Sequence, residues 1–140
     1  MTVNIKLQEK IKTEVIQAEK SLLLALRQGE LLTGVAMHLN SPDYRNIWNG
    51  EIKTYQMLES RIKMGIGKGL VSIDYQVQGR DFDLINEDTV LETLTATETT
   101  TMKDGTSVTS NLTAISILWQ RINNVWRLGY LHASELSKEK

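Results

Sequence analysis

The sequence predicts an α+β fold in which three N-terminal helices pack on a curved, mainly antiparallel sheet. In three segments before residue 67, apolar residues recur every three or four positions, as on one face of a helix. From residue 70 onward the apolar period changes to two, and turn signals separate the strand-like segments. With 140 residues, the chain is long enough to bury a core and is expected to form one domain over residues 1–140.

The three predicted helices differ in length and in the signals that end them. The first spans residues 4–28, and its apolar stripe consists of Ile11, Val15, Ala18, Leu22 and Ala25. Gly29 is expected to end it, because glycine often follows the last turn of a helix. A second helix over residues 30–39 stops before Pro42, since the residue preceding a proline is disfavoured in helical conformation. The third helix is predicted over residues 52–66.

One short strand is predicted before the third helix and four long strands after it. The short strand covers residues 44–48 and ends at the turn signal Asn49-Gly50. The long strands are expected within residues 70–85, 89–102, 107–122 and 125–135, with a bulge at Gly79. Asp104-Gly105 and Asn123-Asn124 are typical of tight hairpin turns, because these residues tolerate positive φ.

The last hairpin, residues 112–134, predicts which side chains share a face. With Asn123 and Asn124 as a two-residue loop, the facing pairs are Trp119 with Leu128, Ile117 with Tyr130 and Ile115 with His132. This register predicts an apolar face that ends in His132 and forms the wall of a pocket.

The preceding hairpin adds two glutamates to that wall. With a loop at Asp104-Gly105, the expected pairs are Leu94 with Ile115, Glu92 with Ile117 and Glu98 with Asn111. Glu92 and Glu98 would then point inward. A slip of one residue would turn both outward, because side chains alternate between the two faces of a strand.

The order of these elements, with Trp126-x-Leu128-x-x-x-His132-x-Ser134 on the last strand, resembles the nuclear transport factor 2-like superfamily. It is most similar to the SnoaL-like, steroid-isomerase-like branch, over residues 10–135. The last strand also resembles that of the calcium/calmodulin-dependent kinase II association domain. The resemblance implies a cone-shaped fold in which a strongly curved sheet wraps a long helix and the open end of the cone is a pocket. It also implies a homodimer that packs through the outer face of the sheet.

The residues of the final hairpin independently favour a contact surface. Leu112, Ala114, Leu118 and Leu131 are expected on its outer face. A sheet face turned to water is usually polar, whereas this face is largely apolar and is expected to meet another surface. That surface is either a second subunit or the N-terminal helix of the same chain.

His132 is the candidate acid–base group of the expected pocket, because imidazole exchanges a proton near neutral pH. Glu92 would orient its ring, while Tyr130 and Tyr75 would polarise a ligand oxygen. The rest of the ligand-binding pocket is expected to include Trp48, Glu98, Ile115, Ile117 and Trp119.

Each catalytic candidate also has a structural interpretation. His132 could be a core histidine whose nitrogens are satisfied by its neighbours, and the two tyrosines could be amphipathic core residues. Glu92 could be a rim carboxylate paired with Arg121 or Arg61.

The sequence departs from the steroid isomerases at one position that matters for chemistry. Isomerases of this fold carry an aspartate base on the short strand before the third helix, whereas residues 44–48 read YRNIW, without a carboxylate. Proton abstraction by the isomerases' own residue set is therefore not expected. The first hypothesis is a small-molecule-binding cone whose other residues give it acid–base activity, of isomerase or lyase type, on an apolar carbonyl compound. The second is a non-catalytic ligand-binding or homo-oligomerisation module.

Composition argues against several other classes. The net charge is −1 and the basic residues are scattered, so no nucleic-acid partner is expected. The N-terminus is too polar for a signal peptide and no apolar run could span a membrane, so a cytoplasmic location is expected. There is no cysteine, and His38 and His132 lack the spacing of metal ligands. We therefore expect no metal and no cofactor.

Overall fold

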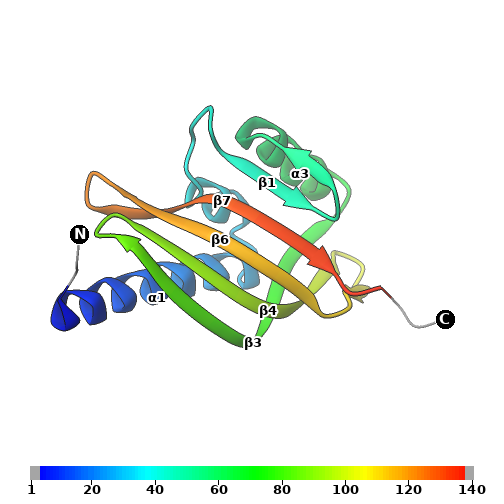
Figure 1. Cartoon of the computed structure of the whole chain (residues 1–140). Helices are drawn as coiled ribbons and strands as arrows, with labels where there is room; N and C mark the ends of the chain where they lie inside the picture. Colours follow the sequence, from blue (N-terminus) through cyan, green and yellow to red (C-terminus); the bar gives the residue numbers. More distant parts are fainter. Residues whose placement is uncertain (1–3, 138–140) are drawn as a thin grey trace.

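The computed structural model describes residues 4–137, so the first and last three residues of the expected domain lie outside the described part of the chain. A seven-stranded sheet and three helices make up the fold (Figure 1). The elements are α1 (Ile5–Arg27), α2 (Leu31–Ala36), β1 (Arg45–Trp48), β2 (Glu51–Lys53), α3 (Tyr55–Gly67), β3 (Leu70–Asn86), β4 (Thr89–Met102), β5 (Ser107–Thr109), β6 (Thr113–Ile122) and β7 (Val125–Glu135).

The strands follow the order β2-β1-β7-β6-β4-β3, and β5 pairs with β4 outside this path. All pairs are antiparallel except β1 with β7, which run parallel and join the N-terminal hairpin to the end of the long meander. The expected α+β arrangement with a mainly antiparallel sheet is therefore confirmed.

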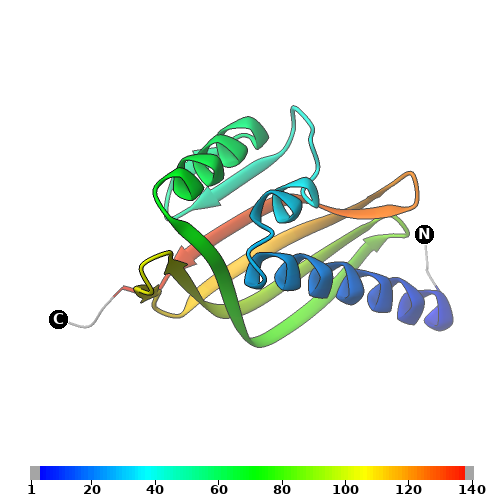
Figure 2. The same cartoon turned by 180° about the vertical axis from the view of Figure 1, so that it is seen from behind.

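All three helices cover the same, concave face of the sheet, as Figure 2 shows from the helix side. Ile11, Val15 and Leu22 of α1 belong to the buried core, as the apolar stripe predicts. The backbone of Gly29 adopts a φ of +85°, the left-handed conformation expected of a residue that ends a helix. The outer face of the sheet is not covered by α1, so the alternative in which this helix shields it is wrong (Figures 1 and 2).

Strand β3 bends sharply in its middle, and this bend lets the sheet curl around the helices (Figure 2). The pairing of β3 with β4 shifts between Val77 and Gly79, which confirms the bulge predicted at Gly79. Beyond the shift, Phe82 and Leu84 of β3 and Val90 of β4 pack against the core, whereas Arg80 and Glu92 on the same strands are polar.

Several element boundaries differ from those predicted from local sequence signals. The third helix begins at Tyr55 rather than at residue 52, because the Thr54 side chain accepts a hydrogen bond from Met57 N at 3.3 Å and caps the helix there. Glu51–Lys53 forms β2 instead, paired with β1 across a turn in which Asn49 and Gly50 have positive φ. The second helix ends at Ala36, and the expected strand over residues 107–122 is interrupted between β5 and β6.

The most consequential difference lies in β7. Trp119 pairs with Leu128 as predicted, but the next pair is Leu118 with Tyr130, so Gly129 is an extra residue in β7. Because side chains alternate along a strand, this bulge reverses the face of every residue that follows it. The predicted pairs of Ile117 with Tyr130 and Ile115 with His132 are therefore wrong, and Leu131 and Ala133 occupy the inner positions.

Two contacts accompany the bulge. The backbone of Leu128 bonds to the segment that follows α2, through Leu39 N to Leu128 O at 2.8 Å and Leu128 N to Met37 O at 3.3 Å. The Gln120 side chain lies over Gly129, where a β-carbon would be 2.0 Å from Gln120 Oε1.

Within the described part of the chain, no helix is both long and apolar enough to cross a membrane.

Candidate functional site

A cavity of about 310 Å³ lies between the three helices and the concave face of the sheet. Its wall is mostly apolar, with side chains from all three helices and from β1, β2, β3, β4, β6 and β7. All six residues expected to form the ligand-binding pocket line it, namely Trp48, Tyr75, Glu98, Ile115, Ile117 and Trp119. The register of β4 with β6, which pairs Glu92 with Ile117 and Leu94 with Ile115 as predicted, places Ile115 and Ile117 on this wall.

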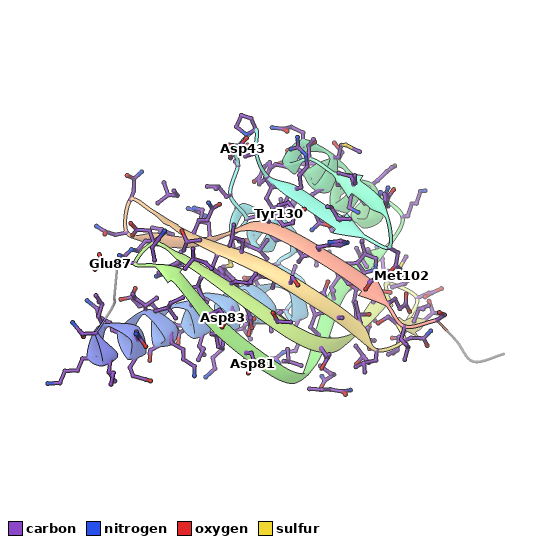
Figure 3. The ribbon with its side chains drawn as sticks, viewed as in Figure 1. Asp43, Asp81, Asp83, Glu87, Met102 and Tyr130 are labelled. Atoms are coloured by element: carbon purple, nitrogen blue, oxygen red, sulfur yellow. The ribbon has the colours of Figure 1, made fainter. Side chains whose placement is uncertain are left out.

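None of the three catalytic candidates, His132, Tyr130 and Glu92, lines this cavity. His132 and Tyr130 lie on the outer face of the sheet, where Tyr130 is 37% exposed (Figure 3). The β7 bulge turns them outward, so the prediction that they face the pocket is wrong. The same shift moves Leu131 from the expected outer face to the cavity wall, where it is 9% exposed. Leu112, Ala114 and Leu118 keep their outward orientation, with Leu118 half-buried.

Glu92 points inward, as expected, but it is a fully buried member of a polar cluster behind the cavity wall. Its Oε1 accepts a hydrogen bond from Trp119 Nε1 at 2.9 Å. Arg80 lies between two carboxyl groups, with Nη2 2.7 Å from Glu19 Oε1 and Nε 3.6 Å from Glu92 Oε2. The interpretation of Glu92 as a rim carboxylate paired with Arg121 or Arg61 is therefore wrong.

Glu92 is protonated at neutral pH. Glu19 Oε1 and Glu92 Oε2 are both buried, and the Arg80 guanidinium is their cationic neighbour in the described part of the chain. Burial, followed by the hydrogen bond and the charge of Glu19, raises the pKa of Glu92 to about 9. A protonated Glu92 donates to Glu19, and the cluster with Arg80 is then electrically neutral.

A second polar pair, Tyr75 and Glu98, lies on the cavity wall itself. The Tyr75 hydroxyl donates to Glu98 Oε2 in a short hydrogen bond. Burial raises the pKa of Tyr75 well above its usual range, and the charge of Glu98 adds to this effect. Burial also raises the pKa of Glu98, opposed by the hydrogen bond from Tyr75. The pair therefore places a carboxylate of increased basicity beside a neutral phenol.

His38 also lines the cavity, and the sequence reasoning did not assign it a role. Its Nδ1 lies 3.0 Å from the carbonyl oxygen of Gly34; because a carbonyl only accepts, Nδ1 carries the proton and Nε2 is an acceptor. Burial lowers the pKa of His38 to about 4, so the ring is neutral at pH 7. In the sequence, His38 follows Val35 by three residues and so lies on the apolar side of the predicted helix. This position is the signal that could have identified His38 as a cavity residue.

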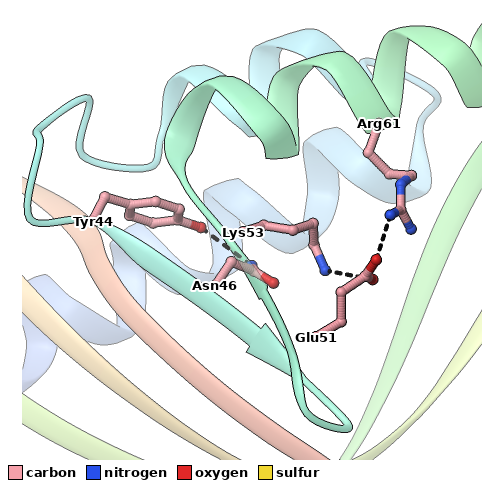
Figure 4. Close-up of polar contacts among 5 residues, drawn as sticks. All are labelled: Tyr44, Asn46, Glu51, Lys53 and Arg61. Carbon is pink, nitrogen blue, oxygen red and sulfur yellow. Dashed lines mark hydrogen bonds and ion pairs between the residues drawn. The ribbon is translucent and has the colours of Figure 1, made fainter.

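Three charged residues of the cavity lining, Glu51, Lys53 and Arg61, lie together, and the side chains of Glu51 and Arg61 are about half exposed to solvent (Figure 4). Glu51 bridges two cations, since Lys53 Nζ lies 3.3 Å from its Oε1 and Arg61 Nη2 lies 2.6 Å from its Oε2. Asn46 faces Lys53 across the β1–β2 pair, and its Nδ2 donates to Tyr44 Oη at 3.2 Å. Within residues 4–137, no three His, Asp or Glu side chains are placed to hold a metal ion.

Neither a family model nor a curated protein matches the sequence. Solved structures do match the fold. A candidate scytalone dehydratase from Novosphingobium aromaticivorans DSM 12444 superposes with a TM-score of 0.81 at 8% identity, over 96% of this chain and 89% of that one. A nuclear transport factor 2-like superfamily protein from Salmonella enterica serovar Typhimurium gives 0.77 at 15% identity, over 95% and 96% of the two chains.

This chain has the nuclear transport factor 2-like fold. A third similar structure, a candidate calcium/calmodulin-dependent protein kinase II association domain from Xanthomonas campestris, has a TM-score of 0.73 at 16% identity, over 90% of this chain and 88% of that one. The cone-shaped α+β fold that the sequence resemblance implied is thereby confirmed. The charged residues Glu51, Lys53 and Arg61 belong to the cavity lining of this chain.

Proposed function

We propose that the cavity binds a small, largely apolar carbonyl compound and that the Tyr75–Glu98 pair performs acid–base chemistry on it, of isomerase or lyase type. The observation that carries this proposal is the hydrogen-bonded phenol and carboxylate on an otherwise mostly apolar wall. Small-molecule sites commonly combine an apolar lining with a few polar groups that orient the ligand. The similar fold of a candidate scytalone dehydratase gives further support.

Glu98 acts as the general base. Its Oε2 accepts from Tyr75, whereas Oε1 has no hydrogen-bond partner in the described part of the chain and is available to the ligand. Burial makes its carboxylate a stronger base, so it removes a proton from the carbon next to the ligand carbonyl. Once Glu98 holds that proton, the Tyr75 hydroxyl is free to donate to the developing enolate oxygen. His38 Nε2 offers a neutral acceptor for a ligand hydroxyl.

The test uses 2-tetralone, an apolar ketone with acidic protons, as the probe. Proton NMR in deuterated buffer follows both its binding and the exchange of its C1 protons. We expect the wild type to bind the ketone and to accelerate exchange, and Glu98→Gln to lower the exchange rate by a factor of about 10²–10⁴ with binding retained. Tyr75→Phe should lower the rate less, because the base remains.

The matched control is His132→Ala, which removes an exposed imidazole on the outer face of the sheet and should change neither binding nor exchange. Equal loss of exchange in this variant would contradict the assignment to Tyr75 and Glu98. Binding without accelerated exchange would favour the non-catalytic binding module, and no binding at all would exclude the proposed use of the cavity.

The outer face of the sheet supports a second role, formation of a homodimer. The β7 bulge changes its composition, because Leu91, Leu118 and Tyr130 now stand side by side in one cross-strand row. Ala114 lies on the same face, whereas Leu131 does not. An exposed row of this kind is more apolar than a sheet face in contact with water usually is.

Leu118→Arg should convert the dimer to a monomer, because a charge at the centre of the row cannot be buried without a partner. Multi-angle light scattering measures the change in mass. Met64→Arg, at an exposed position on α3, is the control and should leave the mass unchanged. A wild-type mass equal to that of one chain would show that the row is not a dimer interface.

A further inference from the structure

We infer that the ligand of this cavity carries a carboxylate, which Lys53 and Arg61 bind at the cavity mouth. This inference rests on the proposed ligand-binding function and adds to it the chemical class of the ligand. It is independent of the acid–base step, because the two cations come from β2 and α3 whereas Tyr75 and Glu98 come from β3 and β4 (Figure 4).

Lys53 is the first reason. Its side chain is only 8% exposed, yet it lines the cavity and, among residues 4–137, has a single ionic partner, Glu51 Oε1 at 3.3 Å. An ammonium group has three donors and is costly to bury unless acceptors surround it. Opposite Lys53 in the sheet, Asn46 is also buried, and its Nδ2 retains a second hydrogen beyond the one given to Tyr44 Oη. This part of the wall therefore presents hydrogen-bond donors in excess.

The balance of charge is the second reason. Glu51 is shared between Lys53 and Arg61, so the three groups together carry one net positive charge. Of the other carboxyl groups that line the cavity, Glu19 pairs with Arg80 and Glu98 accepts from the neutral hydroxyl of Tyr75, so neither offsets the charge of Lys53 or Arg61 by direct contact. A carboxylate at the mouth would supply the missing negative charge and would accept from both cations.

The position of the two cations at the edge of an apolar cavity suits a ligand that is an amphipathic acid. Arg61 and Glu51 are about half exposed, whereas the rest of the wall is mostly apolar and buried. A ligand with an apolar body and a terminal carboxylate could place the body inside and keep the charged end at the opening. A buried carboxylate deeper in the cavity would lose its hydration without such partners.

The competing interpretation is that Glu51, Lys53 and Arg61 form a purely structural ion triad. A substitution of Glu51 distinguishes this interpretation from an anion-binding site. If Lys53 and Arg61 serve only to pair with Glu51, then Glu51→Gln removes their partner and does not strengthen the binding of an added carboxylate. If they form an anion site, the same substitution removes their internal competitor and strengthens the binding of an added carboxylate.

The experiment compares 4-phenylbutyrate with 4-phenylbutanamide, which have the same shape but differ in charge, by isothermal titration calorimetry at low salt. The wild type should bind the acid about tenfold more tightly than the amide, as one charge-assisted pair implies. Lys53→Met should remove this preference while the amide still binds. Arg61→Gln, at a half-exposed position, should reduce it, and Glu51→Gln should increase it.

Lys63→Met, a substitution of an exposed lysine on α3, is the matched control and should keep the wild-type preference. Equal affinity of the wild type for acid and amide, or a preference unchanged in both Lys53→Met and Arg61→Gln, would overturn the inference. Either result would leave the proposed function intact if 2-tetralone binds. If neither phenylbutyl probe binds, the inference also fails, and the 2-tetralone experiment then decides the proposed function separately.

Discussion

The Glu92→Gln variant should be as stable as the wild type at pH 4 and more stable than it at pH 9. Glutamine keeps the acceptor for Trp119 Nε1 and offers an N–H toward Glu19, so it reproduces the protonated form of Glu92. In the folded protein, burial and Glu19 raise the pKa of Glu92 from 4.5 to about 9. Between these values the unfolded chain has lost a proton that the folded protein still holds.

The sign follows from this difference in bound protons. The contribution of Glu92 to stability is fully present below about pH 4.5 and decreases as the pH rises toward 9. The decrease amounts to at most about 1.4 kcal/mol for each pH unit. Glutamine does not titrate, so the advantage of the variant over the wild type should grow with pH.

Urea unfolding at pH 4, 5, 7 and 9 measures this prediction as a difference between the two proteins. Glu59→Gln is the matched control, since Glu59 lies on α3 and its one ion pair among the described residues is with Lys63 at 3.9 Å. Its stability should follow the wild type at each pH to within about 0.5 kcal/mol. Parallel curves for Glu92→Gln and the wild type would contradict the raised pKa of Glu92.

The second large effect is expected on the acidic side, from His38. Burial lowers its pKa from 6.5 to about 4, so the unfolded chain binds a proton in this interval that the folded protein does not. The contribution of His38 is therefore present above pH 6.5 and is lost as the pH falls toward 4, by a total of about 3 kcal/mol. His38→Asn should remove this loss, because an amide can donate to Gly34 O without titrating.

The measurement is the stability of His38→Asn relative to the wild type at pH 7, 5.5 and 4. We expect the variant to be less stable at pH 7, since it fills less of the wall and loses the edge contact with Tyr44 at 5.7 Å between ring centroids. This deficit should shrink by about 3 kcal/mol by pH 4. His132→Asn changes an exposed histidine and serves as the control. A deficit that stays constant with pH would show that His38 titrates normally.

Local patterns determined most of the framework of this protein. The turns at Asn49-Gly50, Asp104-Gly105 and Asn123-Asn124 were predictable because these residue types tolerate positive φ, which all of them except Asp104 show in the structure. The period of the apolar residues located α1, β4 and β7 to within two residues.

The predicted register of β4 with β6 is also observed, and Glu92 and Glu98 point inward. The hairpin loop alone does not set this register, because β4 pairs with β5 one residue away from it and the irregular segment between β5 and β6 restores it. The predicted pair of Glu98 with Asn111 is therefore wrong, since Glu98 bonds to Ser110.

The identity of the site depended on contacts between distant segments. Gly129 gave no sign of a bulge by itself, because the bulge arises where Leu128 bonds to the chain after α2, about 90 residues earlier in sequence. That one extra residue moved His132 and Tyr130 out of the cavity and Leu131 into it. Glu51–Lys53 likewise had a helical pattern and became a strand only through pairing with β1.

The set of elements and the alternation of side chains along β4 and β6 are thus encoded locally, because turn chemistry and side-chain alternation act over a few residues. Which titratable groups share the cavity depends instead on how the elements pack in three dimensions. Tyr75 meets Glu98 through the pairing of β3 with β4, and Glu19 meets Glu92 because α1 packs against the sheet. Burial then sets their protonation, and burial is a property of the packed molecule rather than of any segment.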